Sequence, residues 1–206
     1  MVSQRTAEKN IRKVFDLATP EDLESGRAWY QEAHDFAVGL SIEYTVPVKA
    51  VSHVIAALSP GVRWESNKRA AAELFDAARH VETFPTLPGY TANTRKAWEI
   101  ARNALYGGKL WETILSGPKV TAFADNILNP PDSNRVTVDV HAISVAEYKI
   151  YTVKSAPKLT PRQYEIYVKA YTKVAKSVNL KPSELQAICW VAWRKLVKEW
   201  TKKGVK

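Results

Sequence analysis

The sequence has little of what disulfides and metal sites require. Cys189 is the single cysteine among 206 residues, which excludes an intrachain disulfide and a metal cluster held by cysteines alone. The four histidines are scattered, and none shows the HxxxH type of spacing that zinc sites use. From the sequence we therefore expect no metal and no other cofactor.

Long apolar runs are also missing. No stretch reaches the ~18 consecutive apolar residues that indicate a membrane-spanning helix. The first ten residues, MVSQRTAEKN, lack the apolar core of a secretory signal peptide. We therefore expect a soluble, cytoplasmic protein with no membrane partner.

Strand patterns are almost absent, and helical periodicity takes their place. RVTV at residues 135–138 is the one strand candidate and is too short to build a sheet, and residues 83–90 (TFPTLPGY) are expected to form a loop. The spacing of apolar residues predicts about nine helices, near 21–41, 46–58, 64–80, 94–106, 109–115, 121–128, 142–151, 161–180 and 182–200. We predict an all-α fold, one domain over residues 1–206, as a compact bundle of two lobes, with the N- and C-terminal helices forming the second lobe.

Positive charge is concentrated in the last quarter of the chain. The net charge is +9, yet residues 151–206 hold 13 lysines and arginines against three acidic residues, whereas residues 1–150 hold 17 against 18. Such asymmetry predicts an anionic partner, with nucleic acid the first candidate. The alternative is a solvated lysine-rich face that only aids solubility.

Residues 109–128 predict a helix-hairpin-helix, in which two short helices flank a tight Gly-containing turn. The second helix ends before the Pro-Pro break at residues 130–131. The N–H groups of such a turn and of the second helix's N-terminus point at one spot, which suits a phosphate. We expect contacts to the DNA backbone that read no base, made by five residues of the turn, namely Ser116, Gly117, Lys119, Val120 and Thr121.

Asp139 follows Lys119 by twenty residues and lies where a helix N-cap is expected. An apolar segment of helical length, Ala142 to Tyr151, comes directly after it. Lys119 and Asp139 are the two residues of this part of the chain whose side chains are suited to take part directly in a reaction.

Together these segments resemble the helix-hairpin-helix DNA glycosylases, the HhH-GPD superfamily of endonuclease III and 8-oxoguanine DNA glycosylase. In that family a hairpin of the type G-h-G-x-K carries a catalytic lysine, and a VDxH segment roughly twenty residues later carries a catalytic aspartate. Gly117-Pro118-Lys119 matches half of the first pattern, and Val138-Asp139-Val140-His141 matches the second. Residues 57–74 and 91–105 are similar to the two helices before the hairpin, so the resemblance covers about residues 45–150.

The sequence departs from the family in three ways. Leu115 stands where the first glycine of the hairpin would be, and the cluster-binding cysteines of the endonuclease III branch are missing. The chain is also too short for the extra β-domain of the 8-oxoguanine branch. The resemblance therefore implies a minimal, divergent member whose target base cannot be taken from either branch.

The resemblance implies a monomeric DNA glycosylase, or glycosylase and AP lyase, acting on double-stranded DNA with a flipped nucleotide in the nucleoid of a bacterial or phage-infected cell. Asp139 would stabilise the positive charge that builds on the sugar as the N-glycosidic bond breaks. Lys119, freed of its proton by burial, would attack C1′ and form a Schiff base. The target base must leave the stack and enter a pocket, whose candidate residues are Arg63, Trp64, His141, Gln186 and Trp190. Arg63 and Trp64 are also candidates for filling the gap that the base leaves.

Each assignment has a structural alternative. Lys119 would then be only a phosphate clamp and Asp139 only an N-cap. His141, Trp64 and Trp190 would be structural or core residues, and Gln186 would make a buried contact with Arg194. Two other functions stay open for the chain. Some virus-encoded relatives of the superfamily are thought to transfer groups on hypermodified pyrimidines of viral DNA, and the chain also suits a non-catalytic DNA-binding module.

Overall fold

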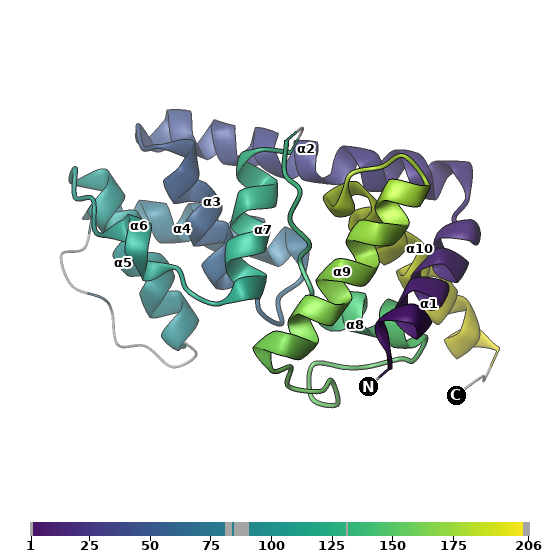
Figure 1. The fold of residues 1–206 in the computed structure, drawn as a ribbon. Coiled ribbons are helices and arrows are strands. Elements are labelled where there is room, and N and C mark those ends of the chain that lie inside the picture. The colour runs from purple at the N-terminus through teal and green to yellow at the C-terminus, as the bar shows by residue number, and fades with distance from the viewer. Residues whose placement is uncertain (1, 81–83, 85–90, 131, 204–206) are drawn as a thin grey trace. The chain divides into compact units, whose positions relative to one another are not determined.

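The protein is all-helical, as the sequence predicts. The computed structural model describes residues 2–80, 84, 91–130 and 132–203, which form ten helices and no strand (Figure 1). Residues 135–138, the one strand candidate, form no strand and lie in the segment between α7 and α8. The predicted loop at 83–90 lies, except for Phe84, outside the described residues. The helices are α1 (Gln4–Asp16), α2 (Pro20–Tyr44), α3 (Val48–Leu58), α4 (Trp64–His80), α5 (Ala92–Leu105), α6 (Trp111–Ile114), α7 (Pro118–Leu128), α8 (Val140–Glu147), α9 (Pro161–Ser177) and α10 (Pro182–Lys202).

Local capping signals explain why most helices begin near the predicted residue. At α9 the Thr160 hydroxyl accepts a hydrogen bond from the N–H of Gln163, and Pro161 occupies the first helical position. Helices α1 and α8 differ most from the prediction. The sequence pattern does not predict α1, whose charged stretch buries only three apolar residues, Ala7, Ile11 and Val14. Helix α8 ends at Glu147 and not near residue 151, because the next residue, Tyr148, is in the left-handed conformation with φ of 49°.

The chain divides into two compact units. Residues 1–31 and 131–206 form one, which we call the terminal unit, and residues 32–130 form the other, the central unit. Helix α2 contributes to both, since the division falls within it. The terminal unit has 20 lysines and arginines against 11 acidic residues, whereas the central unit has ten of each. The whole net positive charge therefore belongs to the terminal unit.

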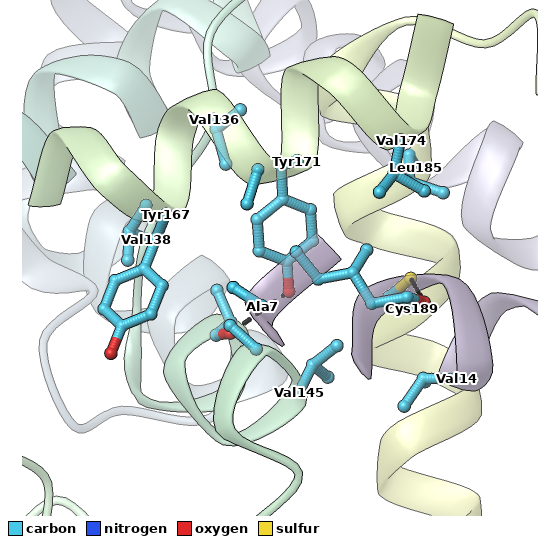
Figure 2. Packing of buried hydrophobic residues seen from close by; sticks show 14 of the residues in the cluster. Ala7, Val14, Val136, Val138, Val145, Tyr167, Tyr171, Val174, Leu185 and Cys189 are labelled. Atoms are coloured by element: carbon cyan, nitrogen blue, oxygen red, sulfur yellow. Dashed lines mark hydrogen bonds between the residues drawn. The ribbon is translucent and has the colours of Figure 1, made fainter. Parts of the chain in front are cut away.

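Helices α1, α8, α9 and α10 of the terminal unit share one apolar core, part of which Figure 2 shows. Tyr171 points from α9 into this core, and its hydroxyl donates to the carbonyl of Ala142 in α8 at 3.1 Å. Gly26 of α2 lies against α10, where an added Cβ would stand 2.5 Å from the Cα of Ile188. This close approach of two backbones requires glycine.

Helix α3 forms the centre of the central unit. Eight consecutive residues, Ala50 to Ala57, are buried, because α4, α5 and α7 all pack against this one helix. A helix that is apolar on every side is stable only when neighbours surround it. In the described part of the chain, no helix is long and apolar enough to cross a bilayer.

Candidate functional site

The residues predicted to form the hairpin, 109–128, include the short helix α6, the residues 115–117 that follow it, and α7. Helix α7 starts at Pro118, three residues before the predicted start at Thr121, because proline suits the first helical position. Gly117 precedes it with φ of 100°, a conformation that favours glycine. Leu115, which stands where the glycosylase hairpin pattern has its first glycine, is only 9% exposed and follows the end of α6. The residue that replaces this glycine is therefore packed against its neighbours.

The five residues predicted to contact the DNA backbone are all at least partly accessible to solvent. Ser116 and Gly117 are exposed, and Lys119, Val120 and Thr121 are half-buried. The Thr121 hydroxyl donates to the Gly117 carbonyl at 3.0 Å and so holds the turn. Lys96 of α5 donates to the Ser116 hydroxyl at 3.3 Å. Sequence reasoning misses Lys96 because no local pattern links it to the hairpin.

A buried histidine lies behind the hairpin. The ring of His53, on α3, lies edge-on to Trp111 of α6, with centroids 5.6 Å apart. Among the described residues its Nδ1 has no hydrogen-bond partner. Burial, and then the charge of Lys49, lower the pKa of His53, while Asp125, Glu112 and a backbone hydrogen bond at Trp111 oppose this. His53 is therefore kept neutral where α3 supports the hairpin.

Asp139 is the N-cap of α8, which confirms the predicted position. Its backbone is extended, and Oδ1 accepts a hydrogen bond from the N–H of Ala142 at 2.8 Å. The side chain is half-buried, and no other hydrogen bond or ion pair to its carboxylate occurs within the described ranges. One oxygen is thus fixed by the helix, and the other is not.

Aromatic and cationic side chains surround the first turn of α8. The rings of His141 and Trp190 have centroids 6.3 Å apart, and Trp29 of α2 lies 5.6 Å from Trp190. The Arg194 guanidinium lies over the Trp190 ring at 4.7 Å. Burial lowers the pKa of His141; the Asp139 charge opposes this shift and Arg194 adds to it. We call Asp139, His141, Trp190, Arg194 and Trp29 the α8–α10 cluster.

Gln186 is buried one turn before Trp190, at 6% exposure. Its Oε1 accepts a hydrogen bond from the Tyr30 hydroxyl at 3.0 Å, and that hydroxyl also lies 3.2 Å from the Thr137 hydroxyl. The predicted buried contact between Gln186 and Arg194 is wrong, because the Arg194 side chain is exposed and lies over Trp190. Sequence reasoning misses Tyr30 and Trp29, which contact Gln186 and Trp190 of α10.

The structure brings some of the predicted site residues together. Contacts within the terminal unit link Asp139, His141 and Trp190, and Gln186 lies one helical turn before Trp190 and bonds to Tyr30, whereas Lys119 and the hairpin belong to the central unit. Arg63 is exposed and Trp64 half-buried, also in the central unit, with the Trp64 ring 6.2 Å from Phe36. The pairing of Lys119 with Asp139 stays a prediction. In the part of the chain that the structure describes, no three His, Cys, Asp or Glu side chains are grouped as metal ligands.

The model of a family of unknown function (DUF7178) matches residues 1–197. The match extends over both units, so it includes the hairpin and the α8–α10 cluster. No curated protein and no solved structure matches the chain. The resemblance to DNA glycosylases is separate from this match and rests chiefly on residues 117–119 and 138–141.

Proposed function

The chain belongs to the family of unknown function DUF7178, and we propose that it is a DNA N-glycosylase, with or without AP lyase activity. It would act as a monomer on double-stranded DNA from which one nucleotide is flipped. The observation that carries the proposal is the position of Asp139. Its carboxylate is half-buried and oriented by the N–H of Ala142 through one oxygen, beside aromatic side chains that suit a base.

Asp139 would act on the sugar. As the N-glycosidic bond breaks, positive charge builds at C1′, and a preoriented carboxylate stabilises that charge better than water, which must reorganise. The hydrogen bond from Ala142 supports this role because it fixes the carboxylate and leaves Oδ2 for the sugar.

Lys119 would be the nucleophile of the same reaction. Its amine would form a bond to C1′ while the bond from C1′ to the base breaks, and the base would leave with the bonding electrons and take up a proton. Opening of the sugar ring then gives a Schiff base, from which an AP lyase eliminates the 3′ phosphate. The half-buried position of Lys119 at the first turn of α7 supports this role.

The hairpin would hold the DNA backbone. Its exposed turn at Ser116 and Gly117 leads directly into the N-terminus of an 11-residue helix, where backbone N–H groups favour an anion. Lys96, bound to the Ser116 hydroxyl, adds a second cation beside Lys119. These contacts would position the protein without reading sequence.

The α8–α10 cluster would receive the flipped base. Indole, imidazole and guanidinium groups all present flat faces that stack on bases. Gln186 would act indirectly, since its hydrogen bond to Tyr30 holds α10 against α2. Arg63 and Trp64 of the central unit would occupy the gap that the base leaves.

A second candidate function is a DNA-binding module without catalysis. It is favoured by the hydrogen bond from Ala142 to Asp139, because capping α8 is by itself a sufficient structural reason for an aspartate at this position.

The test is incubation with duplexes that carry uracil, 8-oxoguanine, alkylated or hydroxymethylated bases. We expect release of one of these bases and, for a lyase, a covalent complex trapped by borohydride. Lys119→Gln should abolish trapping, whereas Lys109→Gln, at an exposed lysine just before α6, should leave it unchanged. Absence of base release and trapping, together with DNA binding that Asp139→Asn does not alter, would show the binding module instead.

A further inference from the structure

The segment between α8 and α9 presents a surface that the proposed function does not use. We propose that this loop, residues 149–158, contacts duplex DNA through three lysines and two exposed aliphatic side chains, namely Lys149, Lys154, Lys158, Ile150 and Val153. The proposal rests on the proposed function in taking DNA as the ligand. It adds a contact in the terminal unit that is separate from the hairpin of the central unit.

The lysines of the loop form no ion pair with a described acidic side chain, although the charge of Lys149 helps to lower the pKa of Glu147. No acidic residue occurs between residues 148 and 160, and the three lysines are exposed and make no ion pair within the described ranges. Helices α9 and α10 differ in this respect, because three of their lysines have acidic partners, in the pairs Lys169–Glu165 and Lys173–Glu8, each 2.8 Å, and Lys195–Asp22 at 3.6 Å. Lys181, the residue just before α10, also lies 3.6 Å from Asp132. Among polymers, a nucleic acid with its phosphate backbone fits such a run of lysines without ion pairs best.

Aliphatic side chains stand between these lysines. Val153 is 69% exposed and Ile150 is 41% exposed. Apolar side chains in a basic surface suit the grooves of DNA, where they contact sugars and base edges while cations hold the phosphates on either side. One ligand therefore explains why both kinds of side chain occur in this loop.

The loop is held in shape by its own hydrogen bonds. The backbone N–H of Thr152 donates to the Ser155 hydroxyl at 2.9 Å, and the N–H of Ser155 donates to the Thr152 hydroxyl at 3.2 Å. Before this turn the Tyr151 hydroxyl donates to Glu147 at 2.7 Å, and after it Leu159 packs against the core of the terminal unit. In Figure 1 the loop is the green segment that joins α8 to α9. A preformed tip loses little conformational entropy on binding, which favours affinity.

An anionic membrane is the competing ligand for lysines beside aliphatic side chains. Proteins that lie on membranes use an amphipathic helix with tryptophan, phenylalanine or leucine on its apolar face. Residues 149–158 form no helix, and their exposed apolar side chains are one isoleucine and one valine. The loop therefore fits DNA better than lipid.

The lysines are tested by the salt dependence of binding, with fluorescence anisotropy of a labelled duplex. The variant Lys149→Gln/Lys154→Gln/Lys158→Gln should lower the slope of log K against log salt by about 2.7, at roughly 0.9 for each lost phosphate contact. Between 50 and 200 mM salt the wild type should then lose about 40-fold more affinity than the variant. The matched control Lys169→Gln/Lys173→Gln/Lys195→Gln makes the same change in net charge at lysines that are already paired, and should lower the slope by less than about 1.

The apolar contact is tested separately by Val153→Thr, which keeps the shape of the side chain and replaces a methyl by a hydroxyl. Affinity for the duplex should fall roughly fourfold, the equivalent of one buried methyl group. Ile42→Thr, at an exposed aliphatic side chain of the central unit (75% exposed), should leave affinity unchanged.

The outcomes separate this proposal from the proposed function. If the wild type does not bind duplex DNA, both fail. If it binds, and Lys119→Gln weakens binding while the loop variants behave as their controls do, the loop proposal alone fails. The same holds if the loop variants lose binding to phosphatidylserine vesicles and keep DNA binding, because the loop would then be a membrane contact.

Discussion

Asp139 and Ala142 are joined by a hydrogen bond of 2.8 Å from the backbone N–H to Oδ1, so the proposed catalytic carboxylate is also the N-cap of α8. The two roles make different demands on the side chain. Asparagine caps a helix about as well as aspartate, whereas alanine does not. Only the charged carboxylate stabilises a sugar cation.

Substitution at Asp139 therefore separates stability from activity. We expect Asp139→Asn to unfold in urea within a few tenths of a kcal/mol of the wild type and to lose base release. Asp139→Ala should lower the free energy of unfolding by about 1 kcal/mol and also lose activity. If the Asp139→Asn variant releases the base at the wild-type rate, the only role of Asp139 is to cap α8.

Two glycines of α2 should respond to alanine in opposite directions. At Gly26 the new Cβ would stand 2.5 Å from the backbone of Ile188, and at Gly39 it would meet nothing within 4 Å. We expect Gly26→Ala to lower the free energy of unfolding by about 1–3 kcal/mol through overpacking. Gly39→Ala should raise it by about 0.5–1 kcal/mol, since alanine suits a helix interior better than glycine. Urea titrations that show equal effects would mean that α2 and α10 do not cross closely at Gly26.

Gly117 tests the turn of the hairpin. An added Cβ would lie 3.9 Å from Val120, an ordinary contact, so the obstacle to alanine is the φ of 100°. We expect Gly117→Ala to lower the free energy of unfolding by about 1–3 kcal/mol, or to reshape the turn, and to weaken DNA binding. Asparagine, which tolerates positive φ better than alanine, should retain more of both. The measurements are urea unfolding and anisotropy with the same duplex.

Buried neutral histidines should make stability depend on pH. His53 has a pKa below its ordinary value of 6.5, chiefly through burial, so below pH 6.5 the unfolded chain binds a proton that the folded chain does not. Stability that is fully present above pH 6.5 is then lost as the pH falls toward the folded pKa. We expect urea unfolding to show this decline in the wild type and a shallower decline in His53→Leu. His141 shifts in the same direction, and the remaining slope should fall when it is replaced as well. An unchanged slope in His53→Leu would contradict the buried neutral state.

The helix starts were accessible to sequence reasoning because capping acts over three or four residues. Thr160 with Pro161, and Asp139 before its apolar segment, each carry the information for a helix start in one short stretch. The same reasoning fails for α1, since a short charged helix that buries three apolar residues gives too weak a pattern. It also fails for the end of α8, where a tyrosine takes the left-handed conformation that usually signals glycine or asparagine.

By itself the sequence determined the all-helical class, most helix starts, the glycine-dependent turn before Lys119 and the placement of Asp139 on a helix N-terminus. Only the tertiary structure decided that Tyr30 bonds to Gln186 across 156 residues of chain, that Trp29 joins His141 and Trp190, and that Lys96 reaches the hairpin. The physical reason is range. Caps and turns act between near neighbours in the chain, whereas these contacts depend on how apolar helix faces pack, and packing leaves no local pattern to read.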